Sequence, residues 1–292
     1  INDLHSHILI NDAIGILDGE ITEEDVKNAP VEMKKNFDLA IRYARNESQK
    51  VSTMLDRAIT LGDWSGLAGL TAHTLQNSDC MPSYWIQLTS TPWGAAEAAY
   101  RVFRDATLCD PHRTSAWAQM ARARLWLGDY TGVEDVAREA NQKLEAENGL
   151  LLTAHILALV NAGKVEEAHR ANISQAGRDS QKIMNRAIIA ASLGEADKAA
   201  ELQQRFLARF GTDDRISLSM EAIRGNRSEA NRLARLIDSR PGGYLALMMT
   251  VLLCSCGAPF DLDAAPGFAS KLEESGLRWP PSDSVNFPLK TW

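Results

Sequence analysis

The sequence lacks the charge and apolar patterns that mark nucleic-acid-binding and membrane proteins. It has no run of lysines and arginines, and its formal net charge is −7, whereas binding to a phosphate backbone needs a concentrated basic surface. Its longest apolar run, Tyr244 to Cys256, has 13 residues, which is short of the roughly 20 residues that a membrane-crossing helix needs. We therefore expect no direct nucleic-acid binding and no membrane insertion, and we interpret the apolar run as a buried helix.

Cysteine is also scarce. The chain has 4 cysteines in 292 residues, too few for a small disulfide-stapled scaffold. Cys80, Cys109, Cys254 and Cys256 fall in regions expected to be helical and apolar. This favours reduced, buried thiols and a cytoplasmic location, with the periplasm as the alternative.

The sequence contains no motif that we associate with catalysis or with a cofactor. A glycine-rich phosphate loop, a nucleophile elbow and a nucleotide-binding fingerprint are all missing, and the 6 histidines are scattered. The pairs His5/His7 and Cys254/Cys256 hold possible metal ligands, but residues two apart on a helix point about 160° away from each other. The segment EEAH at 166–169 lacks the second histidine of a helical zinc protease motif. We expect no catalytic residue, no metal and no cofactor.

What the sequence does contain is a glycine that recurs every 31 to 35 residues. Most of these glycines follow an apolar stretch with helical periodicity, where a residue in the left-handed conformation ends a helix at little steric cost. Five residues after each glycine stands a small or apolar residue that lets a second helix pack closely on the first. The predicted turn glycines are Gly62, Gly94, Gly128, Gly163, Gly194, Gly225 and Gly257.

A fixed period of this length is typical of stacked supersecondary units. Strand signals are nearly absent, because no stretch alternates convincingly with β-branched residues. The sequence therefore predicts an all-α fold, a right-handed superhelical solenoid of about six to seven antiparallel helix pairs whose neighbours must stack to bury their apolar faces. An irregular helical bundle is the alternative.

These units resemble tetratricopeptide repeats over roughly residues 48–260. The resemblance rests on the period and on residues that match the family pattern in two consecutive units. These are Ala99, Phe103, Ala106 and Pro111, which correspond to the second helix and its closing proline, and Trp117, Gly128 and Tyr130 in the next unit. That unit departs from the pattern at Met120-Ala121, where the family has Leu-Gly, and at Arg124, where it has tyrosine. Later units keep little beyond the turn glycine and the alanine.

The resemblance implies a binding groove on the concave face, lined by the first helix of each unit. By register, the groove positions are Ala118, Arg122, Leu125, Thr153, Leu157, Val160, Met184, Ile188, Arg215 and Ser219. The family's clamp for a peptide carboxylate is not reproduced, because Ala118, Thr153 and Leu157 stand where polar or charged groups are expected. The predicted groove is apolar with arginines towards its sides, which suits a helix or a hydrophobic segment of a partner. The alternative is that the repeats curl tightly and these side chains fill the core.

The two ends of the chain differ from the repeats. Residues 1–47 are expected to form N-terminal helices, as a capping pair or a divergent first repeat, with one helix ended by Gly19 and a second interrupted by Pro30. Residues 48–275 form the predicted solenoid. Residues 276–292 form an extended tail rich in proline and aromatic residues, which we expect to pack back on the last helix, with docking on a partner as the alternative.

The sequence favours a non-catalytic protein–protein interaction module whose partner is a peptide, helix or domain of another protein, and a homodimer is compatible with it. The segment CGAPFDLDAAPGFASKLEESGLRWPP, residues 256–281, resembles the C-terminal end of proteobacterial proteins that join a winged-helix or cyclase domain to such repeats. This resemblance implies the regulatory part of a larger bacterial signalling or transcription-control protein. The chain opens at Ile1 rather than methionine, so we expect that a targeting segment or a whole domain has been removed. The alternative is a self-contained exported or periplasmic adaptor or assembly factor.

Overall fold

The computed structural model describes residues 23–144, 149–174, 178–211, 213–282 and 285–292. In these residues the chain forms fifteen α-helices and two short 3₁₀ helices, and no strand. The predicted all-α class is confirmed. The helix expected to end at Gly19 and the histidine pair at positions 5 and 7 lie outside the described residues.

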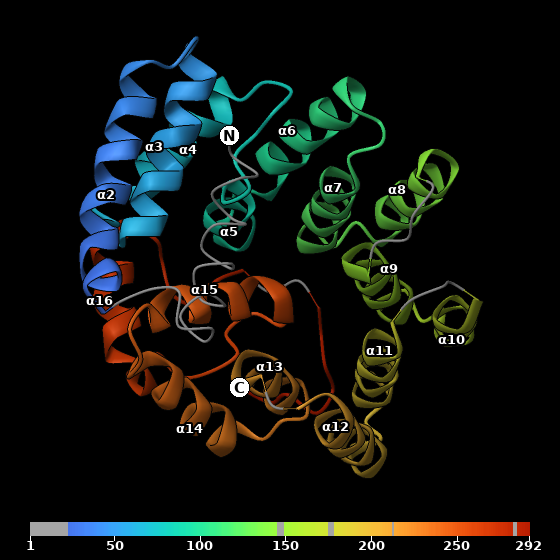
Figure 1. Cartoon of the computed structure of the whole chain (residues 1–292). Helices are drawn as coiled ribbons and strands as arrows, with labels where there is room; N and C mark the ends of the chain where they lie inside the picture. Colours follow the sequence, from blue (N-terminus) through green and yellow to red (C-terminus); the bar gives the residue numbers. More distant parts are fainter. Residues whose placement is uncertain (1–22, 145–148, 175–177, 212, 283–284) are drawn as a thin grey trace.

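The helices follow one another in pairs joined by short turns (Figure 1). The pairs are α3–α4, α5–α6, α7–α8, α9–α10, α11–α12, α13–α14 and α15–α16, with α2 in front of the first pair. Their bounds are α2 (Glu23–Arg42), α3 (Glu47–Leu61), α4 (Leu67–Asn77), α5 (Ile86–Ser90), η1 (Thr91–Trp93), α6 (Ala96–Cys109), α7 (Thr114–Trp126), α8 (Tyr130–Lys143), α9 (Gly149–Asn161), α10 (Val165–Ser174), α11 (Asp179–Ser192), α12 (Ala196–Phe210), α13 (Asp214–Ile223), α14 (Arg227–Asp238), α15 (Gly243–Cys254), η2 (Leu262–Ala264) and α16 (Pro266–Ser275).

The proline in α2 does not have the expected effect. Pro30 was expected to interrupt this segment, but α2 runs through it from Glu23 to Arg42. A proline inside a helix removes one backbone hydrogen bond and crowds the preceding turn. The helix nevertheless continues through this position.

Each pair turns at one of the seven recurring glycines, whose φ angles lie between 68° and 88°. At two of these turns a side chain is excluded by lack of space as well as by backbone conformation. A Cβ at Gly62 would lie 2.1 Å from the hydroxyl of Tyr244, and a Cβ at Gly225 would lie 1.8 Å from the carbonyl oxygen of Leu289. These two turns are therefore contact points for parts of the chain that are distant in sequence.

From the third pair onwards, the first helices form an inner row and the second helices lie outside it (Figure 1). Along the inner row α7 contacts α9, α9 contacts α11, α11 contacts α13, and α13 contacts α15. The small or apolar residue five positions after a turn glycine allows the close approach of the second helix. At six turns this residue is completely buried, namely Leu67, Ala99, Val133, Ala168, Ala199 and Ala230.

The row of pairs closes on itself, so that the helices form a ring (Figure 1). Helix α15 contacts α5 and η1, and α16 contacts α4. Trp64, in the turn of the first pair, is completely buried, and its ring meets Tyr244 and Phe268 edge-on at 5.1 and 6.4 Å between centroids. Glu274 adds two backbone contacts, since its Oε1 accepts from Trp64 N at 3.0 Å and its carbonyl accepts from Gly66 N at 3.2 Å.

The C-terminal tail, residues 276–292, begins by packing on this closure. Gly276 caps α16 in the left-handed conformation. Trp279 then lies against Phe260, Phe268 and Trp93, with ring centroids 5.2, 5.9 and 6.5 Å away. The tail therefore contacts the last pair and the second pair at the same point.

The tail then crosses the ring along the edge where the glycine turns lie. Ser282 N donates to the carbonyl of Pro92 in the second pair at 2.9 Å. Asn286 N donates to Oδ1 of Asn161 in the fourth pair at 3.2 Å, and the carbonyl of Leu289 lies against the turn of the sixth pair. The C-terminus ends beside α13 (Figure 1).

The expectation that the cysteines are reduced is wrong, and the expectation that they are buried is confirmed for Cys254 and Cys256 alone. Cys80 pairs with Cys109, with Cα atoms 5.5 Å apart, and Cys254 pairs with Cys256. Both Cys80 and Cys109 are exposed. Cys80 belongs to the loop between α4 and α5, which packs beside the C-terminal end of α6, and no local pattern predicts that packing.

Within the described residues, no helix combines the length and the apolar character that crossing a membrane takes.

We predict that Trp64→Ala lowers the free energy of unfolding by about 3–5 kcal/mol, because it empties a fully buried aromatic position at the ring closure. Urea unfolding followed by circular dichroism measures this. Leu108→Ala, at an exposed position on α6, is the control and should change stability by no more than about 0.5 kcal/mol. A Trp64→Ala variant as stable as the control would contradict the closed ring.

We predict that the double variant Cys80→Ser/Cys109→Ser loses about 2–4 kcal/mol of stability, because the bridge closes a loop across a sequence separation of 29 residues. Because the serine hydroxyls would face water, loss of packing should add little to this change in the free energy of unfolding. Reductant should lower the stability of the wild type towards that of the variant. Alkylation of Cys80 or Cys109 in the unreduced wild type would disprove the bridge.

Candidate protein-binding site

The predicted groove positions fall into two groups. Six are buried, with exposed fractions of 0 to 7 %, namely Ala118, Arg122, Leu125, Thr153, Leu157 and Ile188. Four are half-buried, namely Val160, Met184, Arg215 and Ser219. Only the second group, which belongs to α9, α11 and α13, offers surface to a partner.

Ring closure is the reason that Arg122 on α7 is buried. Its Nη1 donates to the carbonyl of Leu252 in the last turn of α15 at 3.0 Å, so α15 lies over this part of the inner row. Burial lowers the pKa of Arg122 to about 10, and the guanidinium remains protonated at neutral pH. Among the described residues no carboxylate forms an ion pair with it. The C-terminal end of α15, with its partly unpaired carbonyls, is a favourable place for a cation.

Thr153 and its neighbours form a buried polar network rather than a groove surface. Thr153 Oγ1 donates to Asn185 Oδ1 at 3.1 Å, and Asn185 Nδ2 donates to Asn172 Oδ1 at 3.2 Å. Gln181 donates to Thr153 as well. Because these residues lie on α9, α10 and α11, the network fixes the fourth pair against the fifth.

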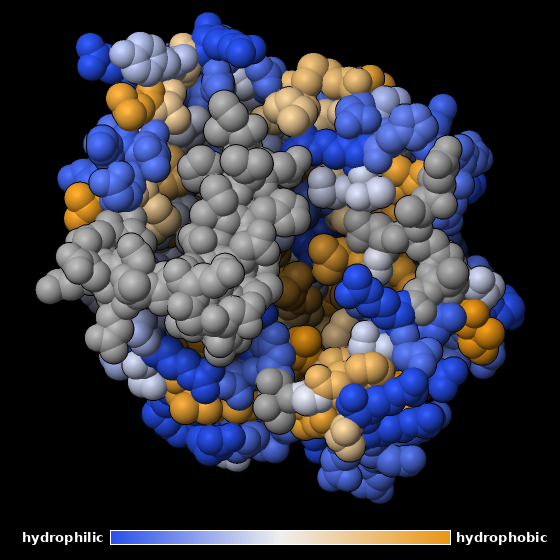
Figure 2. Space-filling view, viewed as in Figure 1, coloured by the Kyte–Doolittle hydropathy of each residue, from blue (hydrophilic) through white to orange (hydrophobic). Residues whose placement is uncertain are grey.

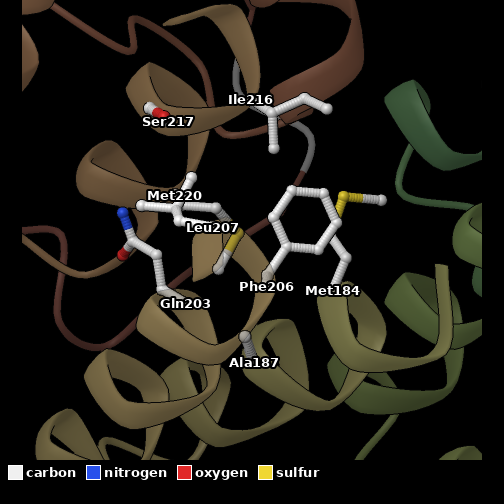
Figure 3. Close-up of a pocket in the computed structure, with 8 residues that line it drawn as sticks. All are labelled: Met184, Ala187, Gln203, Phe206, Leu207, Ile216, Ser217 and Met220. Atoms are coloured by element: carbon white, nitrogen blue, oxygen red, sulfur yellow. The ribbon is translucent and has the colours of Figure 1, made fainter. Parts of the chain in front are cut away.

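The molecule has a central hollow whose visible floor is apolar and whose rim is largely hydrophilic (Figure 2). Between α11, α12 and α13, the side chains of Met184, Phe206 and Ile216 lie close together, with Met220 behind them (Figure 3). The cavity that they leave is about 10 Å³, room for about one water molecule. It is too small for an organic ligand, so this part of the ring presents a wall rather than a pocket.

This wall is rich in methionine and carries little unpaired charge. Arg215 lies at its side, where its Nε and Nη2 donate to Asp213 at 3.1 and 2.8 Å. The side-chain hydrogen bonds from Arg215 lower the pKa of the Asp213 carboxyl, so the pair stays ionised and mutually neutralised. Arg215 also reaches the sulfur of Met249 on α15 at 3.9 Å. Methionine side chains are flexible and polarisable, and they are common on surfaces that adapt to a bound segment.

The tail supplies contacts that the groove prediction did not include. Val285 and Phe287 are 5 % and 2 % exposed, whereas Asn286 and Pro288 are exposed. Side chains that alternate between buried and exposed are typical of an extended chain with one face on a surface. The signal was present in the sequence as V-x-F-x-L, but the contacts of this segment come from Asn161 and Gly225, which lie 125 and 64 residues before the tail residues that they meet.

A second hollow, of about 380 Å³, lies on the outer side between α8, α9 and α10. Its lining carries charges of both signs, from Glu134, Arg138, Glu167 and Arg170. Desolvation lowers the pKa of His155 in this lining, so its imidazole is neutral at pH 7. In the part of the chain that the structure describes, no three or more histidine, cysteine, aspartate or glutamate side chains gather as metal ligands.

Comparison with protein-family models, with curated proteins and with solved structures finds no match for this chain. The function is therefore argued from the surface itself rather than from the fold, because one fold can serve many functions. The surface that remains accessible is the apolar wall of α11 and α13 together with the half-buried end of α9.

We predict that an introduced cysteine reacts faster at Met184 than at Leu157, because the first position is half-buried and the second is buried. The native cysteines are paired, so the introduced thiol is the reactive one. Alkylation of Met184→Cys should be at least about tenfold faster than alkylation of Leu157→Cys, as followed by mass spectrometry. Equal rates would mean that the ring is open in solution.

Proposed function

We propose that this chain is a non-catalytic protein–protein interaction module, built as a tetratricopeptide-like solenoid of helix pairs that binds its partner in the central hollow. The glycine period and the stacked pairs support the comparison with that family. The observation that carries the proposal is the apolar wall at Met184, Ile216 and Met249, which ring closure leaves partly open while six of the predicted groove positions are buried.

An apolar wall of this kind favours a partner segment that inserts its own apolar side chains. Each such side chain that is fully buried contributes roughly 1.5–3 kcal/mol, and ordering of the segment opposes part of this gain. Because Arg215 is paired with Asp213, the electrostatic potential at the wall is not strongly positive or negative. Recognition then depends on shape and apolar contact rather than on charge.

Two biological contexts remain from the sequence, namely the regulatory part of a larger signalling or transcription-control protein and an exported adaptor. The paired cysteines favour the second, because disulfides form and persist in oxidising compartments such as the periplasm. A periplasmic adaptor is therefore the second candidate function that we put forward. Both contexts use the same binding surface.

The proposal predicts that Met184→Glu combined with Met249→Glu weakens capture of the native partner at least about tenfold, because two carboxylates would be desolvated against its apolar segment. Both positions are half-buried, so the variant should keep its helical circular dichroism. The matched control is Leu236→Glu on the outer helix α14, where the leucine is also partly exposed. Leu157 and Ile188 are unsuitable for this test, because glutamate at a buried position would unfold the chain.

The capture is measured in the source cells with a photo-crosslinking residue at Ile216, and the crosslinked protein is identified by mass spectrometry. Capture that survives both glutamates would place the site elsewhere. A chain that crosslinks to no defined protein from the hollow or from the outer face would refute the interaction-module proposal.

A further inference from the structure

We infer that residues 285–292 of the tail act as a resident ligand, and that the partner's binding segment is a chain with apolar side chains at the spacing of Val285, Phe287 and Leu289 which displaces them. This inference rests on the proposed function and specifies the kind of partner. The segment meets the ring at three points, namely its buried side chains, Asn161 and Gly225.

The first point is the alternation of side chains along the segment. Val285 and Phe287 are buried in the main core, and Leu289 packs against it. Asn286 and Pro288, between them, face solvent. Val285 and Phe287 thus supply apolar contact before the turn at residues 288–289, and Leu289 and Trp292 add to it. A different chain with the same spacing of apolar side chains would supply this contact equally well.

The second point is a prepared acceptor for the backbone. Asn161, at the end of α9, uses its own Nδ2 to donate to the carbonyl of Leu157 at 3.0 Å. This bond orients the amide so that Oδ1 accepts from the backbone N–H of Asn286 at 3.2 Å. Because the bond is made to main chain, it does not depend on which residue occupies position 286.

The third point is the close approach of backbone at the sixth turn. The carbonyl oxygen of Leu289 lies where a Cβ of Gly225 would stand, 1.8 Å from it. Gly225 therefore leaves a gap that admits a passing main chain as well as giving the turn its positive φ. Asn161 and Gly225 together form a track that meets the main chain at residues 286 and 289, whatever side chains stand there.

The segment itself fits this track imperfectly, which makes it displaceable. Among its described residues, the N–H of Asn286 makes the main-chain bond to the ring, whereas Lys290 N bonds within the segment to Phe287 O at 2.9 Å. Trp292 Nε1 is buried without a hydrogen-bond partner, and such a donor disfavours the bound state. A partner chain that places an apolar side chain there avoids that loss.

The test uses the full chain, a variant that ends at residue 284, and a fluorescent peptide with the sequence VNFPLKTW, residues 285–292. The shortened variant should bind the peptide in trans, measured by fluorescence anisotropy. The full chain should bind it at least about tenfold more weakly, because the tethered segment competes at an effective concentration in the millimolar range. A peptide with Phe287→Ala is the matched control and should bind the shortened variant at least about tenfold more weakly than the native peptide.

A shortened variant that keeps its helical circular dichroism and does not bind the peptide would overturn the inference, and so would equal binding of both peptides. Should the shortened variant not fold, the full-length variant Phe287→Ala takes its place. It should bind the native peptide more tightly than the wild type does, and no gain would count against a displaceable tail. Photo-crosslinking at Ile216 separates the two proposals. If a partner is captured at Ile216 but the peptide does not bind, the proposed function stands and this inference is refuted.

Discussion

The contact between the first and last helix pairs, centred on Trp64, determines the form of the rest of the molecule. In an open array of helix pairs each pair contacts only its neighbours, and the end pairs expose one apolar face. Here the faces of the two end pairs cover each other, with Tyr244 and Phe268 against the Trp64 ring. Closure therefore replaces the polar caps that an open array needs. It also fixes the width of the ring, since α15 must reach α5.

That width divides the inner face into a packed part and an accessible part. Where α15 approaches α7, Arg122 is desolvated, and the last turn of α15 provides its acceptor. A buried cation with a carbonyl partner is less favourable than one with a carboxylate, and it persists here because the hydrophobic closure holds the two helices together. Farther round the ring, α11 and α13 carry the half-buried Met184 and Ile216, which lie close together (Figure 3). The binding surface that we propose is thus confined to the arc that closure does not cover.

The features that the sequence predicts are those set by neighbouring residues. The positive φ of Gly128 and the burial of Ala199 follow from the helix end and the helix spacing of one pair, so a local pattern is enough. The pairing of Cys80 with Cys109 and the contact of Trp64 with Phe268 depend instead on which distant segments meet. Register placed Leu157 and Met184 on the same concave face, yet only the global curvature decides that the first is buried and the second half-open.

The curvature also accounts for the role that we propose for the tail. An uncovered apolar surface promotes association with unrelated chains, and the tail covers part of the apolar surface of the ring with its own Val285 and Phe287. The same cover sets a threshold, because a partner must exceed the affinity of a tethered competitor before it is bound. A segment that follows the Asn161–Gly225 track and lacks the unpaired donor of Trp292 passes that threshold. Selectivity in such a site therefore comes from how well a partner segment fits relative to the tail. A variant whose tail binds the ring more weakly would accept a broader range of partners and would bind each of them more tightly.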